Sequence, residues 1–274
     1  MSSSSASTSA ATSILERIFA AKRAELEAER AATPLEAIRE AARRAPAPRD
    51  FLAALHARRP AIIAEIKRAS PSKGDILPGL DPAAVAREYA LSGAAAISVL
   101  TDQHFKGSLE DLRTVRAAVD LPLLRKDFIF DPYQLHQARA AGADCILLIA
   151  AMLQEAGLCA LYAAAREIGL QALVEVHNED ELRVAERAGT EIVGINNRDL
   201  HTFVTDIAVT ERLLAGYCGA ALVVSESGID TPEDIRRLDR VGARAFLVGE
   251  SLLRGGHPRQ NLEALRSALT GSEG

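Results

Sequence analysis

Four charged side chains in this sequence lie at or near the carboxyl ends of short hydrophobic runs, where a folded protein usually keeps apolar residues. They are Glu65, Lys67, Lys126 and Glu175. A lysine at such a position can serve as a general acid, as a Schiff-base nucleophile or as a holder of an anion. A carboxylate flanked by apolar residues has a raised pKa unless a cation lies near, which suits a general acid or base. These residue types indicate acid–base chemistry in a buried site.

Structural roles stay open for the same residues. Glu65 and Lys67 are two residues apart on one predicted strand and share a face, so they could form a buried ion pair without a catalytic role. Lys126 could extend its amino group to the solvent from a structural position. Glu175 taken alone could equally be structural. Arg125 projects to the face opposite Lys126, and we expect it to be structural.

Glycine and serine residues after the seventh and eighth runs are typical of a phosphate site. Ser227 and Gly228 follow the seventh run, and Gly249 and Ser251 follow the eighth. Glycine lets the backbone approach a ligand, and backbone N–H groups in such loops can point at a phosphate. Parallel barrels often bind phosphate at these two loops, although plain surface loops are the alternative.

Other residues could orient or bind a substrate. Asn196 and Arg198 could hold a hydroxyl or an anion, although asparagine also serves turns. The basic loop 67–74 contains Ser70 and could reach the same phosphate, or it could be a surface loop. Phe105 follows the second run, where it could form a wall for an aromatic substrate or simply cover the end of the fold.

Eight short apolar runs, roughly 20 to 35 residues apart, must position these side chains. Runs of this length and composition are typical of strands buried on both faces in a parallel sheet. The runs are Ile62–Lys67, Ala96–Leu100, Leu121–Lys126, Cys145–Ile149, Ala172–Val176, Ile192–Asn196, Leu222–Glu226 and Ala245–Gly249. In a closed parallel barrel the carboxyl ends of the strands form the rim that carries the chemistry.

Between the runs the sequence repeats one unit, a helix that begins at a capping residue and ends at a glycine. The capping side chains are Asp81, Ser108, Asp131, Asn178 and Thr231. The glycines are Gly93, Gly142, Gly169, Gly189 and Gly242. Alternating strands and helices predict an α/β fold, and eight units predict a (β/α)8 TIM barrel over residues 61–274. An open nucleotide-binding sheet would carry G-x-G-x-x-G after its first strand, and this motif is absent there.

The segment before the barrel is expected to be helical. Residues 14–60 would form an N-terminal helical extension packed on the barrel. Ser13 would begin the first helix with a capping box, and Thr33 would cap a second helix that has Pro34 at its first position. Residues 1–13 are rich in serine and alanine and carry no charge, so we expect a disordered leader and not a secretory signal.

Composition limits the partners. The 274 residues carry a net charge of −5, which argues against nucleic acid or an anionic membrane as a bulk partner. No apolar stretch reaches the roughly 18 residues of a membrane helix. The three cysteines form no C-x-x-C motif, which fits a reducing compartment, and the histidines show no metal-ligand spacing. We expect a cytoplasmic monomer that binds no metal, membrane or nucleic acid.

The segments around these residues resemble the indole-3-glycerol-phosphate synthase family. The similar segments are residues 63–74, 125–134, 173–177, 194–200, 225–229 and 247–252. The resemblance runs from about residue 14 to residue 268. It implies a TIM barrel and a carboxy-lyase step of tryptophan biosynthesis, without a metal or organic cofactor. The substrate would be 1-(2-carboxyphenylamino)-1-deoxyribulose 5-phosphate, and the products would be indole-3-glycerol phosphate, carbon dioxide and water.

The resemblance also implies roles for single residues. Lys126 would be the general acid that protonates the ketone oxygen during ring closure. Lys67 would contact the substrate and act in the dehydration, while Glu65 and Glu175 would orient the lysines and move protons. The other matching positions are the substrate-orienting Asn196 and Ser227 of the catalytic set and, for substrate and phosphate binding, Ser70, Phe105, Arg198, Gly228, Gly249 and Ser251.

Two other functions remain possible from the residues alone. One is a different phosphate-binding barrel enzyme, such as a sugar-phosphate isomerase or a Schiff-base lyase that would use Lys126 as its nucleophile. The other is a barrel that binds a phosphorylated sugar without catalysis. The four charged residues argue against the second, because a binding module has no need for so many buried charges.

Overall fold

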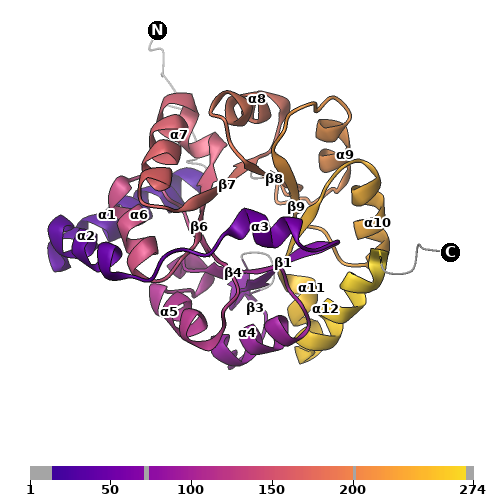
Figure 1. The fold of residues 1–274 in the computed structure, drawn as a ribbon, viewed down its shortest axis with the longest axis horizontal. Coiled ribbons are helices and arrows are strands. Elements are labelled where there is room, and N and C mark those ends of the chain that lie inside the picture. Colours follow the sequence, from indigo (N-terminus) through magenta and orange to yellow (C-terminus); the bar gives the residue numbers. More distant parts are fainter. Residues whose placement is uncertain (1–13, 71–73, 200–201, 270–274) are drawn as a thin grey trace, which may run out of the picture.

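The computed structural model of this chain describes residues 14–70, 74–199 and 202–269. Within these residues eight parallel strands close into a barrel with helices around it (Figure 1). The barrel strands are β1 (Ala61–Ile66), β4 (Ala96–Leu100), β5 (Leu123–Lys126), β6 (Cys145–Ile149), β7 (Gln171–Val176), β8 (Ile192–Asn196), β9 (Leu222–Glu226) and β10 (Ala245–Val248). Each strand pairs with its neighbours in the chain, and β10 closes the ring against β1. The predicted (β/α)8 barrel is confirmed.

The predicted runs match these strands closely. The largest difference is in β5, which begins at Leu123 although its apolar run begins at Leu121. Pro122 lies between them and has no N–H group to donate to a neighbouring strand, so regular pairing starts after it.

Helices cover the outside of the barrel. They are α4 (Pro82–Leu91), α5 (Leu109–Ala118), α6 (Pro132–Ala140), α7 (Ala150–Glu167), α8 (Glu179–Arg187), α9 (Ala208–Leu214), α10 (Pro232–Arg240) and α12 (Pro258–Arg266). All five predicted capping side chains accept a backbone N–H of their own helix. All five predicted helix-ending glycines have a positive φ. These local signals explain where five of the eight helices start and where five of them stop.

Shorter elements lie between them and were not predicted. A two-residue hairpin, β2 (Ala69–Ser70) with β3 (Gly74–Asp75), follows β1, and a one-turn helix, α11 (Glu250–Leu253), follows β10. Single 3-10 turns form at Gln103–Phe105, Arg254–Gly256 and Ser267–Leu269.

Two apolar clusters hold the barrel together. One lies between the strands and the outer helices. The other fills the barrel interior with residues that alternate along the strands, such as Ile63, Leu124 and Leu173. Helix α3 (Phe51–His56) adds Phe51 and Leu55 to this inner cluster and crosses the barrel (Figure 1). One end of the interior is thus filled with apolar side chains, which leaves the other end for polar ones.

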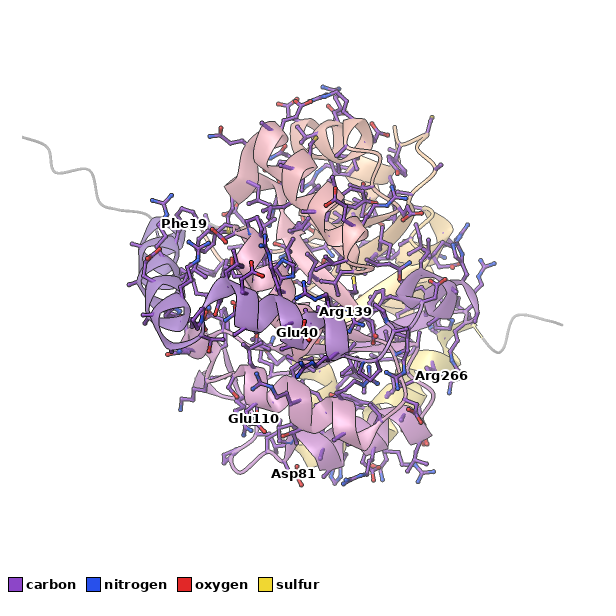
Figure 2. All side chains as sticks on the ribbon, turned by 60° about the vertical axis from the view of Figure 1, so that its left-hand side comes forward. Phe19, Glu40, Asp81, Glu110, Arg139 and Arg266 are labelled. Carbon is purple, nitrogen blue, oxygen red and sulfur yellow. The ribbon has the colours of Figure 1, made fainter. Side chains whose placement is uncertain are left out.

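Three helices precede the first strand, in agreement with the predicted extension: α1 (Ile14–Ala32), α2 (Leu35–Arg44) and α3. Figure 2 shows Phe19 on α1 and Glu40 on α2 on the side of the molecule that also bears Arg139 of α6. The ring of Phe19 packs edge-on against Phe130 with centroids 4.8 Å apart. Arg139 donates hydrogen bonds to the carbonyls of Ala45 and Pro46, just after α2.

The predicted cap of the second helix is wrong. Pro34, with extended backbone at ψ 150, stands in the capping position, and α2 begins one residue later at Leu35. Thr33 is then too far from the first free N–H groups, and its carbonyl instead accepts a hydrogen bond from the Tyr133 hydroxyl at 2.8 Å. The predicted leader, residues 1–13, and the cap at Ser13 lie outside the described residues.

Candidate active site

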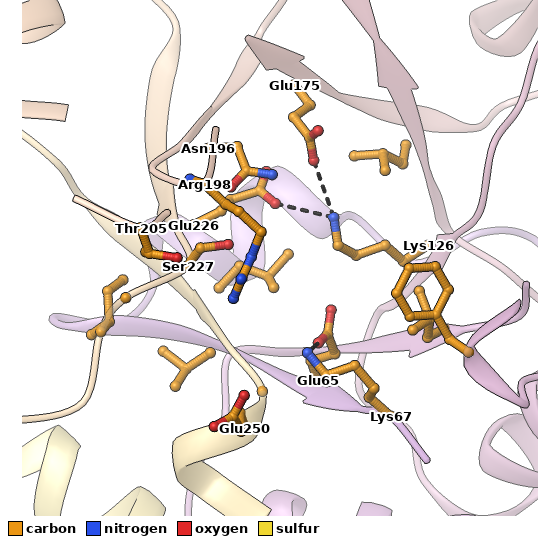
Figure 3. A pocket seen from close by; sticks show the side chains of 18 of the residues that line it. Glu65, Lys67, Lys126, Glu175, Asn196, Arg198, Thr205, Glu226, Ser227 and Glu250 are labelled. Carbon is orange, nitrogen blue, oxygen red and sulfur yellow. Dashed lines mark hydrogen bonds and ion pairs between the residues drawn. The ribbon is translucent and has the colours of Figure 1, made fainter. Parts of the chain in front are cut away.

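The residues at the carboxyl ends of the strands meet in one cavity of about 440 Å³ (Figure 3). Almost all predicted site residues line it: Glu65, Lys67, Phe105, Lys126, Glu175, Asn196, Arg198, Ser227, Gly228, Gly249 and Ser251. The exception is Ser70, for which the structure describes the backbone, paired with Gly74 in the hairpin after β1. These predicted residues come from seven of the eight barrel strands or the loops after them, and Leu147 and Ile149 of β6 also line the cavity.

Lys126 lies at the centre of the charged group. Its Nζ is 3.2 Å from Oε2 of Glu175 and 3.2 Å from Oε2 of Glu226 (Figure 3). Burial lowers the pKa of Lys126, but the charges of Glu226, Glu175 and Glu65 outweigh burial and raise this pKa above its ordinary value. Lys126 is therefore a charged ammonium at neutral pH, with protons to donate.

Lys67 and Glu65 form a second pair beside it. Nζ of Lys67 lies 2.8 Å from Oε1 of Glu65, and both side chains are largely buried. The structural ion pair that the spacing allowed is therefore present. Because both side chains also line the cavity, the pair faces whatever the cavity holds.

The two carboxylates on Lys126 differ in proton affinity. Burial raises the pKa of Glu175, but Lys126 and His177 outweigh it and hold this pKa below the ordinary value. Burial also raises the pKa of Glu226, and with the adjacent charge of Glu175 it prevails over Lys126, so that this pKa is about 7. Near neutral pH, Glu175 is ionised, while Glu226 is protonated in only part of the molecules. When the pKa values of two neighbouring carboxyl groups differ in this way, one group can act as the acid and the other as the base.

Glu226 was not assigned to the site from the sequence. Its signal is the alternation along β9, because Leu222 and Val224 belong to the inner cluster and the next residue on that face is Glu226. The chain makes room for it with Gly194 on β8, where any side chain would overlap Oε1 of Glu226.

The loops after β9 and β10 lie next to each other on the opposite side of the cavity from Lys126. Ser227 and Gly228 have φ of 66° and 76°, which turns the chain sharply after Glu226. The side chain of Asn197 donates to the carbonyl of Ser227 at 3.0 Å and so holds this turn. Ser251 ties the two loops together, since its hydroxyl donates to the carbonyl of Ile229 at 2.8 Å.

Comparisons with known proteins identify the family. A family model described as indole-3-glycerol phosphate synthase matches residues 15–265. The chain belongs to this family. An indole-3-glycerol phosphate synthase of Roseiflexus sp. (strain RS-1) is 54% identical over 250 residues, 88% of this chain and 93% of the relative. One from Chromobacterium violaceum is 49% identical over 257 residues, 92% of this chain and 97% of the relative. The predicted resemblance is confirmed.

Solved structures of lower identity show the same fold. An N-acetylmannosamine-6-phosphate 2-epimerase from Clostridium perfringens superposes with a TM-score of 0.59 at 17% identity, over 74% of this chain and 90% of that one. A thiamine phosphate pyrophosphorylase from Pyrococcus furiosus gives a TM-score of 0.60 at 18% identity, over 82% of this chain and all of that one. These likenesses support the barrel and say nothing about substrate.

The cavity of this synthase-family member also has an apolar side that sequence reasoning found only in part. Phe105 was predicted there, whereas Ile18, Phe128 and Phe203 were not. None of these three residues ends a strand, and Ile18 comes from α1, so strand periodicity gives no signal for them. Arg198 donates to the carbonyl of Phe203 at 3.2 Å and links the polar and apolar sides.

Behind Lys126 lies a buried charge cluster that fixes the start of the next loop. As expected, Arg125 faces away from the cavity, and its guanidinium lies 2.9 Å from Asp127. Nζ of Lys22, on α1, lies 3.0 Å from Asp127 and 3.3 Å from Asp102. Lys22 therefore connects the N-terminal helix to the loops after β4 and β5, next to the proposed general acid.

Neither a membrane span nor a metal-binding cluster is found in the described parts of the chain. No helix there is both long and apolar enough to cross a membrane. No group of three or more His, Cys, Asp or Glu side chains there could hold a metal ion.

Proposed function

We propose that this cavity converts 1-(2-carboxyphenylamino)-1-deoxyribulose 5-phosphate into indole-3-glycerol phosphate, carbon dioxide and water, with Lys126 as the general acid. As a member of its family, the chain is a decarboxylating lyase of tryptophan biosynthesis. The observation that carries the assignment of Lys126 is its ammonium, held charged between Glu175 and Glu226 at the cavity wall.

Ring closure needs an acid because a ring carbon is a weak nucleophile toward a ketone. As the carbon that bears the carboxylate attacks, Lys126 protonates the ketone oxygen, and the carbonyl π bond becomes an O–H bond. The carboxylate then leaves as carbon dioxide, and its bonding electrons restore the aromatic ring. A positioned acid of this kind typically contributes about 10²–10⁴-fold to the rate.

Loss of water needs a second acid–base pair. Lys67, 2.8 Å from Glu65, is placed to protonate the departing hydroxyl while a carboxylate accepts the proton that the product carbon loses. We assign the carboxylate role to Glu175, which is ionised near neutral pH because of Lys126 and His177, although burial acts in the opposite direction. Asn196 also lines the cavity and would orient the substrate hydroxyl.

The phosphate would bind on the side of the loops after β9 and β10. Ser227, Gly228, Gly249 and Ser251 line the cavity there, and backbone N–H groups of these loops would bind the phosphate. Arg198 and Ser70 would add polar contacts to the same end. The anthranilate ring would then lie against the apolar wall that contains Phe105.

We further propose that the protein acts as a cytoplasmic monomer on this small substrate, without nucleic acid. The net charge of −5 supports the last point, because nucleic-acid binding relies on cationic surface. Residues 14–60 would belong to the catalytic unit, since Ile18 of α1 lines the cavity. Sedimentation at assay concentrations tests the monomer, and a stable dimer would contradict it.

The decisive experiment mixes the protein with the carboxyphenylamino ribulose phosphate and follows indole absorbance. Lys126→Ala should lose most turnover while circular dichroism and inorganic phosphate affinity stay unchanged. Arg259→Ala, which removes only an exposed ion pair with Glu263, should turn over normally. Full activity of Lys126→Ala would remove Lys126 from the mechanism. A covalent adduct on Lys126 after borohydride treatment with substrate would instead support a Schiff-base lyase.

A further inference from the structure

A histidine that does not line the cavity connects a buried carboxylate of the site with the protein surface. Nε2 of His177 lies 3.4 Å from Oε1 of Glu175, the oxygen that does not contact Lys126. Nδ1 of the same imidazole lies 3.1 Å from Oε2 of Glu181. The exposed fraction of the side chains rises along this row, from 4% at Glu175 to 13% at His177 and 19% at Glu181.

The start of α8 holds this row in place. Asn178 caps the helix, because its side-chain oxygen accepts the backbone N–H of Glu181 at 3.0 Å. Its amide nitrogen donates to Oε1 of Glu181 at 2.6 Å, which leaves Oε2 for His177. The backbone N–H of His177 donates to the same Oε2 at 2.8 Å. Both the carboxylate and the imidazole are therefore fixed by local hydrogen bonds.

Carboxylates from three elements face His177: Glu181 from α8, Glu175 from β7 and Glu226 from β9. Burial lowers the pKa of His177, but the hydrogen bond to Glu181 and the charges of Glu175 and Glu226 outweigh burial and raise it. Nε2 is buried and has no hydrogen-bond partner in the described part of the chain. A proton on Nε2 therefore has Oε1 of Glu175 as the acceptor within reach.

The reaction consumes a proton, and this step of the inference rests on the proposed function. Replacing a carboxylate by carbon dioxide and a new C–C bond takes up one proton per turnover, which Lys126 delivers to the ketone oxygen. The later loss of water is neutral overall, because the proton that Glu175 takes from carbon replaces the one that Lys67 gives to the leaving hydroxyl. Lys126 must therefore regain a proton once in each catalytic cycle.

Glu226 alone cannot supply Lys126 with a proton in every cycle. It contacts Lys126 and holds a proton near neutral pH, but only 1% of its surface is exposed. Its Oε1 has no hydrogen-bond partner among the described residues, and Glu226 faces the solvent only through the cavity that the substrate would fill. The row through Glu175 and His177 does reach the surface.

We propose that His177, held in place by Glu181, passes a proton through Glu175 to Lys126 in each turnover. The N–H bond at Nε2 of His177 breaks as an O–H bond forms at Oε1 of Glu175. The carboxyl group turns, and its proton passes to Nζ of Lys126 across the 3.2 Å contact. After the product leaves, the neutral imidazole, which keeps its proton on Nδ1, swings outward so that Nε2 takes up a proton from the solvent. His177 thus acts through Glu175 and does not touch the substrate.

The test compares His177→Gln with the parent protein in single-substrate kinetics. The expected kcat of the variant is about tenfold lower, less than the loss of a group that acts directly on substrate, while KM stays within about twofold of the parent value. The variant's kcat should rise with imidazole buffer concentration, and the parent's should not. The acid form of His177 is the active one, so parent activity falls as pH rises through the pKa of His177. This falling limb should be missing in the variant.

Glu181→Gln is the second variant. Without that carboxylate the pKa of His177 should fall, so the limb should move to lower pH, and histidine NMR should show the same shift without turnover. His136→Gln on α6, away from the cavity, is the control and should behave as the parent.

Parent-like pH profiles in both variants, or a loss without buffer rescue, would overturn the relay. Failure of the parent to form indole would instead refute the proposed function, and NMR titration of His177 would still decide whether Glu181 raises its pKa.

Discussion

A side chain at Gly249 would overlap Oε1 of Glu65, so this glycine leaves the space that the buried carboxylate occupies. Gly249 follows β10, and Glu65 is the next-to-last residue of β1, the strand that closes the barrel against β10. Gly194 and Glu226 stand in the same relationship on β8 and β9. Glycine at these positions therefore has a packing reason, separate from the phosphate contact proposed for Gly249.

Gly249→Ala should displace the Glu65 carboxylate and disturb its ion pair with Lys67. We expect a loss of about 1–3 kcal/mol in the free energy of unfolding, typical of overpacking, together with a clear fall in kcat. Urea denaturation and steady-state kinetics measure the two effects.

Gly157→Ala is the matched control. It lies in α7, where the nearest atom to a new Cβ is 3.8 Å away, so it should stabilise the helix by about 0.5–1 kcal/mol. Equal behaviour of the two alanine variants would mean that Gly249 does not make room for Glu65.

Strand alternation explains why most of the site could be predicted from the sequence. Ile63, Leu124 and Leu173 point into the barrel, and the residue two positions further on each strand faces the mouth. These next residues are Glu65, Lys126 and Glu175. Helix caps and glycines fixed the lengths of the intervening units. Long-range packing was not needed for either inference.

Contacts between distant segments could not be predicted in this way. Ile18 and Lys22 reach the site because α1 packs against the loops after β4 and β5, and helical periodicity does not specify that docking. Thr33 shows the local limit: one extended residue, Pro34, moves the helix start by one position and removes the cap. The role proposed for His177 could not be predicted either, because it depends on the contact of His177 with Glu181 of α8, across the loop after β7.

Lys22→Met should destabilise the protein strongly. It would leave Asp102 and Asp127 buried without their shared cation, and Oδ2 of Asp102 has no hydrogen bond within the described residues. Removing one partner of a buried ion pair costs about 3–5 kcal/mol, so we expect a loss of about 3 kcal/mol in urea denaturation.

Two comparisons check this reason for the loss. Adding Asp102→Asn to Lys22→Met should restore part of the stability, because Asp102 would otherwise keep a buried charge without its cation. Arg39→Met, which removes an exposed pair with Glu36, should change it by less than about 1 kcal/mol. A change below that value for Lys22→Met would show that the cluster does not depend on this lysine.

Glu226→Gln should change how stability depends on pH. Burial raises the pKa of Glu226 to about 7, so the folded state binds its proton more tightly than the unfolded state. This contribution is fully present below the ordinary pKa of a glutamate and is lost as pH rises through about 7. The amide does not titrate, so the variant should gain stability relative to the parent between pH 5 and pH 8, by at most about 3 kcal/mol.

Urea denaturation at both pH values tests this expectation. Glu211→Gln is the control, because the hydrogen bond from Arg237 holds the pKa of Glu211 below its ordinary value and that group stays ionised throughout this range. If the stability of the parent and of Glu226→Gln depends on pH in the same way, Glu226 is not the group that titrates near pH 7.

Ser251→Ala should loosen the two loops that we propose hold the phosphate. Its hydroxyl bridges α11 to the carbonyl of Ile229, and losing this bond should cost about 1 kcal/mol of stability. Because the loops would still be present but less fixed, KM should rise several-fold while kcat changes little. Ser267→Ala removes a similar bond, from a hydroxyl to the carbonyl of Ala264, and should leave KM unchanged. If Ser251→Ala instead lowers kcat at constant KM, these loops position the reacting groups and do not anchor the phosphate.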